Sequence, residues 1–136
     1  MCEELIAHVR KNEDGTWAAP HKLLAHLEDT AKRAEMNANK FQSGEWGKAA
    51  GLAHDAGKGR AEWQRYLKIK SGYDEEAHLE GKAGKVPHAI FGAKLGEELF
   101  GKQTGRLLAY CIAGHHAGLP DWSSAEGAGQ SSLQFQ

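Results

Sequence analysis

The 136-residue sequence has little cysteine and no long apolar run. Its two cysteines, Cys2 and Cys111, lack the spacing of a disulfide framework, which fits a reducing compartment, and Cys111 is expected in the core. No stretch approaches the roughly 20 apolar residues of a transmembrane helix, and Glu3 and Glu4 stand where a signal peptide carries positive charge. The sequence therefore predicts a cytoplasmic protein with no membrane partner.

The chain also lacks an excess of charge of either sign. Seventeen basic and 18 acidic residues give a net charge of -1, so nucleic-acid binding would have to use local basic patches. Also absent are a Cys-x-x-Cys pair, a glycine-rich phosphate loop and a Ser-His-Asp arrangement with its flanking signature. With 40% hydrophobic and 26% charged residues, the composition predicts one globular domain of ordinary size.

Hydrophobic periodicity predicts an all-α fold, with helices over about residues 21–41, 45–55, 61–70, 88–100 and 104–115. The apolar stripe of the first helix is predicted from residues at three- and four-residue steps, namely Leu24, Leu27, Ala31, Ala34, Ala38 and Phe41. Small residues in the second predict close helix packing, and Gly57 and Gly59 are expected to end it. Residues 71–87 are expected to form a mobile loop. Residues 123–136 read as a flexible or truncated tail, which leaves 1–122 as the domain.

The stretch Gly51-Leu52-Ala53-His54-Asp55-Ala56-Gly57-Lys58 combines an imidazole, a carboxylate and an ammonium within five residues. Imidazole and carboxylate are common ligands of divalent transition metals, but a His-Asp pair alone is more often a solvated helix end. His26, His88 and the pair at 115–116 also stand at the edge or end of predicted helices. Helices that each deliver such a group can build a metal site in the core of a bundle.

The candidate ligands exceed what one tetrahedral ion needs, which favours two divalent ions that share Asp55. The predicted metal ligands are His26, His54, Asp55, His88, His115 and His116. An imidazole-rich set suits manganese, nickel, cobalt or iron better than magnesium, which prefers oxygen ligands. Lys58 is either a catalytic cation that stabilises phosphate charge or a cation at a helix C-terminus, and both readings stay open. His8 is expected to be a packed or surface imidazole rather than a ligand.

These motifs resemble those of HD-superfamily proteins, and more narrowly the HD nuclease domain of the type I CRISPR-associated helicase-nuclease. The resemblance covers residues 5–121. It is carried by Leu23-Leu24-Ala25-His26-Leu27, by the stretch around His54 and Asp55, by Pro87-His88-Ala89-Ile90-Phe91-Gly92-Ala93 and by His115-His116-Ala117-Gly118-Leu119-Pro120-Asp121. The segments Ala7-His8-Val9-Arg10 and Glu62-Trp63-Gln64-Arg65-Tyr66-Leu67 also look like that family. The last of these motifs makes the CRISPR assignment specific, whereas the early His and the His-Asp pair mark the superfamily only.

The resemblance implies an HD-type helical bundle that cleaves single-stranded DNA in antiviral CRISPR interference. The implied partners are a helicase and the guide-RNA surveillance complex (Cascade). One ion would be held by His26, His54 and Asp55, and the second by Asp55, His88, His115 and His116, with Asp55 and Lys58 as the catalytic residues. The family pattern also includes a later Asp in the shell of the first ion, and a helicase portion. This sequence contains neither, and Asp121 and Glu126 are the candidate substitutes.

Two other functions stay open. An HD phosphohydrolase of small nucleotides would use the same ions in a closed pocket, although the polar loop at 71–87 and the basic helix at 60–70 favour an open groove. A metal-free helical interaction domain is the second alternative, and the missing final Asp supports it. Metal content and a single-stranded DNA cleavage assay would separate the three.

Overall fold

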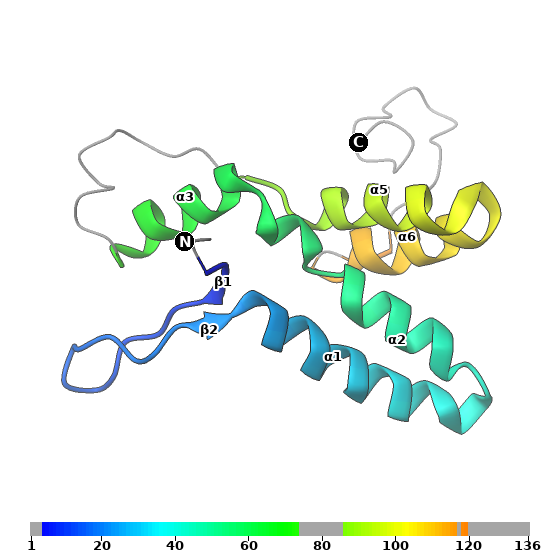
Figure 1. Cartoon of the computed structure of the whole chain (residues 1–136), viewed down its shortest axis with the longest axis horizontal. Helices are drawn as coiled ribbons and strands as arrows, with labels where there is room; N and C mark the ends of the chain where they lie inside the picture. The colour runs from blue at the N-terminus through cyan, green and yellow to red at the C-terminus, as the bar shows by residue number, and fades with distance from the viewer. Residues whose placement is uncertain (1–3, 74–85, 117, 120–136) are drawn as a thin grey trace.

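The computed structural model of the chain describes residues 4–73, 86–116 and 118–119. These residues are mostly helical and include one short antiparallel pair of strands (Figure 1). The strands are β1 (Ile6–His8) and β2 (His21–Lys22). The helices are α1 (Leu23–Ala38), α2 (Gly44–Ala53), α3 (Ala61–Ser71), α5 (Ala89–Phe100) and α6 (Arg106–Gly114). Three short helical segments are η1 (Asn39–Phe41), η2 (Ala56–Gly59) and the π-helical η3 (Gly101–Gly105).

The structure confirms that the chain is mostly helical, but the strand pair shows that it is not all-α. β1 pairs with β2 in register Ile6 to Lys22 and His8 to His21, and β2 occupies the first residues of the stretch predicted to be helical from residue 21. Strands of two and three residues are too short to produce a periodicity that differs from that of a helix. The pairing matters for function because it holds His8 beside the first turn of α1.

Helices α1 and α2 pack side by side along their lengths (Figure 1). A Cβ atom added at Gly51 would lie 2.5 Å from the Cα of Ala31, and one added at Gly47 would lie 2.5 Å from the carbonyl oxygen of Ala34. Real Cβ atoms do not approach backbone so closely, so only glycine fits these two positions. The close helix packing predicted from small residues is therefore present.

The buried face of α1 begins one residue earlier than predicted. Leu23, Ala31 and Ala38 are buried, whereas Leu24 is 67% exposed and Phe41 is 69% exposed. α1 starts directly after β2, so the strand pairing fixes which side chain of the first turn faces inward. Local periodicity predicts the helix, but the tertiary contact with β1 determines which side chain of its first turn faces the interior.

A small core joins α2, α5 and α6, and consists of Ala53, Ala93, Leu108, Ala109 and Ile112. Its side chains are mostly short, so the helices lie close together, and a Cβ atom at Gly92 would collide with the carbonyl oxygen of Ala53. The prediction that Cys111 lies in the core is wrong, since Cys111 is exposed and the neighbouring Ile112 takes the buried position at 1% exposure. Tight packing here brings the C-terminal ends of α2 and α6 toward the N-terminal end of α5.

Several sequence predictions fall outside the described residues. These are the tail at 123–136 with the domain boundary at 122, most of the loop at 71–87, Cys2, and the substitute carboxylates Asp121 and Glu126. Among the helices that the structure describes, none combines the length and the apolar character needed to cross a bilayer.

Candidate metal centre

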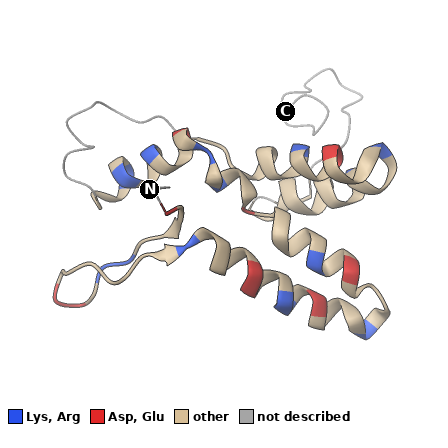
Figure 2. Cartoon of the chain, in the orientation of Figure 1, with Lys and Arg blue, Asp and Glu red and all other residues tan. Residues whose placement is uncertain are grey.

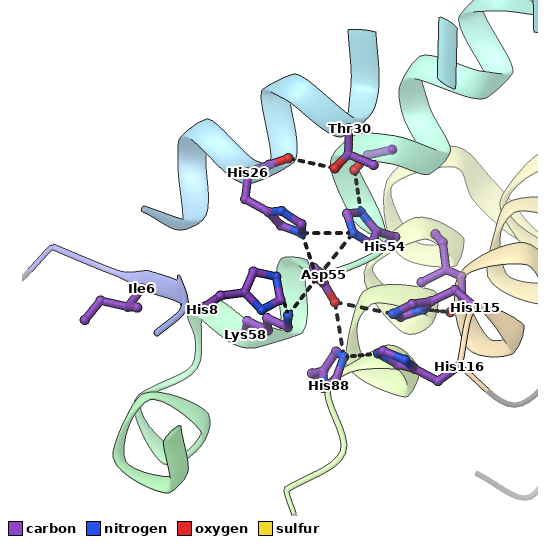
Figure 3. A network of polar contacts seen from close by, with 12 residues as sticks. Ile6, His8, His26, Thr30, His54, Asp55, Lys58, His88, His115 and His116 are labelled. Carbon is purple, nitrogen blue, oxygen red and sulfur yellow. Dashed lines mark hydrogen bonds and ion pairs between the residues drawn. The ribbon is translucent and has the colours of Figure 1, made fainter. Parts of the chain in front are cut away.

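Asp55 lies at the centre of a cluster of imidazoles that come from different helices (Figure 3). It is the second residue after α2 and is 3% exposed, and an ionised carboxylate is costly to bury unless cations or hydrogen-bond donors surround it. The structure brings all the predicted ligands to this carboxylate or to its immediate neighbours. They lie at helix ends: His26 in the first turn of α1, His54 after α2, His88 before α5, and His115 and His116 after α6.

The Oδ2 atom of Asp55 faces one half of the cluster. It lies 2.8 Å from Lys58 Nζ, 2.9 Å from His26 Nε2 and 3.2 Å from His54 Nε2. The two imidazole Nε2 atoms are 3.2 Å apart. His54 Nδ1–H donates to the carbonyl oxygen of Gly51 at 2.7 Å, which leaves the lone pair of its Nε2 directed into the cluster when the ring is neutral. Metal-ligating histidines are commonly oriented by such a bond.

The Oδ1 atom of Asp55 faces the other half, and its environment is different. His88 Nε2 lies 3.1 Å away and His115 Nε2 lies 3.3 Å away, yet neither contact has hydrogen-bond geometry, and this buried oxygen has no hydrogen-bond partner among the described residues. His115 Nδ1–H donates to the carbonyl oxygen of Ile112 at 2.6 Å, so a neutral ring turns a lone pair toward the carboxylate. The Nε2 atom of His116 is 2.9 Å from that of His88.

Converging lone pairs without a proton between them repel, and a cation relieves that repulsion. Asp55, His88, His115 and His116 each offer one ligand atom, and all these atoms lie within 4.8 Å of one another. The unpartnered buried oxygen and the three imidazole nitrogens therefore fit a divalent ion of the transition series.

The ionisation of the cluster is dominated by the Asp55 carboxylate. Burial acts to raise the pKa of Asp55, but the surrounding imidazoles and Lys58 outweigh it and hold the pKa well below its usual range. The carboxylate raises the pKa of His115, whereas burial lowers the pKa of His26 and of His116. Asp55 is thus ionised at neutral pH. A proton on His115 and a metal ion are alternative partners for it, so metal uptake should weaken as the pH falls.

Lys58 belongs to the cluster rather than to a solvated helix end. It lies in η2, its side chain is 5% exposed, and its Nζ is 2.8 Å from Asp55 Oδ2 and 5.2 Å from the centre of the Trp63 ring. A buried ammonium of this kind requires the carboxylate beside it. Of the two sequence readings of Lys58, the structure therefore favours a charge held at the site over a cation at the C-terminus of α2.

His8 lies at the edge of the cluster, as an exposed imidazole packed against His26. Its Nε2 lies 3.4 Å from Lys58 Nζ, and its ring meets the ring of His26 edge-on at 4.8 Å between centroids (Figure 3). Although His8 is solvent-exposed on one side, partial desolvation and the positive charge of Lys58 lower its pKa to about 4, so it is neutral. No local signal could have found this contact, since 50 residues separate His8 from Lys58. The side chain of Gln64 joins the two segments, because it bonds to the backbone of Ile6 and donates to the carbonyl oxygen of Lys58.

Gly57 has a different role from the one predicted. Neither Gly57 nor Gly59 has a positive φ, and α2 already ends at Ala53, so these glycines are not left-handed helix caps. Instead, a Cβ atom at Gly57 would collide with the carbonyl oxygen of His88. Gly57 therefore lets η2 approach the start of α5 closely enough for His88 to reach Asp55.

The composition of the cluster predicts which ions it binds. We expect the purified chain to take up manganese, nickel, cobalt or iron in preference to magnesium, because nitrogen donors outnumber the carboxylate oxygens and magnesium holds water and oxygen ligands instead. Dialysis against equal concentrations of each ion, followed by elemental analysis, measures this preference. Uptake of magnesium above the other ions, or uptake of none, would contradict the expectation.

The described part of the chain is mostly helical and carries a buried cluster of His and Asp residues that could hold a metal ion. Similar clusters occur on unrelated folds, so the arrangement by itself does not name a family. A scan of the chain against protein-family models and a search of curated proteins both give no match.

Proposed function

We propose that the chain is a divalent-metal-dependent phosphodiesterase that cleaves single-stranded DNA, as an HD-type nuclease of type I CRISPR interference. The observation that carries this proposal is the buried Asp55 carboxylate, with imidazoles facing each of its two oxygens. A carboxylate between two sets of donors is how many phosphodiesterases hold a pair of ions. The resemblance of the histidine motifs to the HD nuclease domain supports the finer assignment.

The ligand sets divide between the two oxygens. Asp55 Oδ1 with His88, His115 and His116 would hold one ion, and Asp55 Oδ2 with His26 and His54 would hold the other. Such ions neutralise the charge of a phosphodiester and activate water for its hydrolysis.

Side chains of the protein supply positive charge at the cluster and hold the imidazoles in place. The Lys58 ammonium lies beside Asp55 Oδ2, where it could stabilise negative charge on a phosphate oxygen or on the leaving oxygen. His116 is exposed at one edge of the cluster, and His8 is exposed at the other, while Asp55 between them is buried. The ends of α2, α5 and α6 fix the imidazoles before a substrate arrives, which lowers the entropic cost of positioning it.

The basic residues of α3 favour a polymeric substrate. Arg65, Lys68 and Lys70 lie from the middle to the C-terminal end of α3, which follows η2 in the chain, and the ribbon of this part carries blue segments in Figure 2. A row of cations suits successive phosphates of a strand better than one mononucleotide. In CRISPR interference a helicase would supply the single strand, and a guide-RNA surveillance complex (Cascade) would mark the target, in the cytoplasm.

We expect single-stranded DNA to be cleaved faster than duplex DNA, because a flexible strand can bend a phosphate onto a partly buried cluster. Binding should weaken with salt through counterion release. Cleavage of circular single-stranded DNA, of the matching duplex and of mononucleotides, each with manganese in excess, measures the preference. Faster hydrolysis of mononucleotides would favour the small-nucleotide phosphohydrolase. Absence of both metal uptake and cleavage would favour the metal-free interaction domain.

A further inference from the structure

The two oxygens of Asp55 differ in what already balances their charge. Oδ2 lies 2.8 Å from the Lys58 ammonium and 2.9 Å from His26 Nε2, whereas Oδ1 has no hydrogen-bond partner among the described residues. An ion that binds at Oδ1 displaces at most protons. One that binds at Oδ2 meets a buried ammonium, whose like charge opposes it. The Oδ1 site should therefore fill first, and the Oδ2 site should be weak.

His8 stands on the far side of that ammonium. Lys58 Nζ is 3.4 Å from His8 Nε2 and 2.8 Å from Asp55 Oδ2, so the ammonium lies between an imidazole and a carboxylate (Figure 3). The ligand atoms of His8, His26 and Asp55 lie within 4.8 Å of one another, close enough for one ion to reach all three. A neutral imidazole offers one nitrogen lone pair, which can face either an ammonium or a metal ion.

We propose that His8 joins His26 and Asp55 Oδ2 as a donor of the ion site on that side of the carboxylate, and that the Lys58 ammonium competes with the ion for His8 and Asp55. The inference rests on the proposed metal dependence and extends it to a histidine outside the HD-like ligand motifs. In the metal-free protein Lys58 occupies the cation position, and the ion takes over both donors when it displaces the ammonium.

Two substitutions should have opposite effects on the weak site. Lys58→Met removes the competing charge but keeps a long apolar stem against Trp63, so the second ion should bind at least about tenfold more tightly. His8→Ala removes a donor, so the second ion should bind about 10- to 100-fold more weakly, by analogy with other changes around metal ligands. If His8 served only to hold the Lys58 ammonium beside Asp55, His8→Ala would release the ammonium, and the second ion would bind more tightly instead.

The experiment is a Co²⁺ titration of the metal-free full chain, followed by visible absorption and by calorimetry. The wild-type chain should bind one equivalent tightly and a second weakly. The first equivalent should change much less than the second in both variants, because its imidazole donors lie on the Oδ1 side, away from His8 and Lys58. The double variant His8→Ala, Lys58→Met should lose most of the gain given by Lys58→Met alone, and the cobalt spectrum of its second equivalent should change as a nitrogen donor is lost.

His21→Ala is the matched control. His21 lies on the partner strand with its ring 5.3 Å from that of His26, but it is exposed and outside the donor set, so the titration should match the wild type. A second equivalent that is unchanged in both test variants, or tightened by His8→Ala, would overturn the inference. If His8→Ala does not fold, the same titration is made with His8→Gln, which also removes the imidazole donor. Loss of even the first equivalent in the wild-type chain would instead contradict the proposed function.

Discussion

Asp55→Ala is expected to abolish metal binding and phosphodiester cleavage together, to the level of the metal-free protein. Among the described residues, Asp55 is the one candidate ligand that faces both halves of the cluster, with Oδ1 toward His88 and His115 and Oδ2 toward His26. His88→Ala removes a ligand of the Oδ1 ion alone, so it should weaken that ion about 10- to 100-fold and leave activity that excess metal restores. Elemental analysis and cleavage rates over a range of manganese concentrations measure both effects.

The control for this comparison must separate loss of ligands from loss of fold. Asp55→Ala leaves the Lys58 ammonium buried without its carboxylate, which destabilises the chain. Asp55→Asn also removes the negative charge but keeps the shape and one acceptor oxygen for Lys58, so it should destabilise the chain less than Asp55→Ala and still fail to bind both ions. Asp29→Ala makes the same change at an exposed site on α1 and should leave metal content and rate unaltered. Equal residual rates for Asp55→Ala and His88→Ala would mean that Asp55 does not bridge two ions.

Gly57→Ala is expected to damage both the stability of the chain and the Oδ1 site. The new Cβ atom would collide with the carbonyl oxygen of His88 and lie 2.9 Å from its carbonyl carbon, and backbone cannot swing aside as a side chain can. Overpacking of this kind costs about 1–3 kcal/mol, a large share of the roughly 5–15 kcal/mol that stabilises a domain. The strain should also move His88 away from Asp55, so the first ion should bind more weakly.

Gly59→Ala provides the matched control two residues away. Its added Cβ atom would meet only side-chain atoms of Leu23 and Leu5, at 3.5 and 3.6 Å, which are ordinary contacts. The free energy of unfolding of this variant should stay within about 0.5 kcal/mol of the wild type. Urea denaturation and Co²⁺ affinity report the two effects. Similar values for the two alanine variants would contradict the close approach of η2 to the start of α5.

The helices could be predicted because their hydrogen bonds and apolar faces are local. Periodicity predicted a helix over 61–70, and α3 spans Ala61–Ser71; it predicted one over 45–55, and α2 spans Gly44–Ala53. The strands could not be predicted, since the partners of a strand lie elsewhere in the chain and each strand here has too few residues for a pattern. The burial of Leu23 in place of Leu24 follows from the same strand pairing.

The candidate ligands could be proposed from sequence because residue type and position at helix ends are both visible there. The structure places His26, His54, His88, His115 and His116 around Asp55. How the carboxylate divides them could not be foreseen, since that division depends on side-chain directions and on backbone acceptors such as those of Gly51 and Ile112.

By itself the sequence determined the helices and the chemical nature of the cluster, because both depend on residue type and short-range spacing. The tertiary structure decided the rest. It put the Lys58 ammonium on one oxygen of Asp55 and left the other without a hydrogen bond, brought His8 in from a distant strand, and made Gly57 a point of backbone contact. These features depend on distances between groups far apart in the chain, which only the packing of the helix ends and the strand pair fixes.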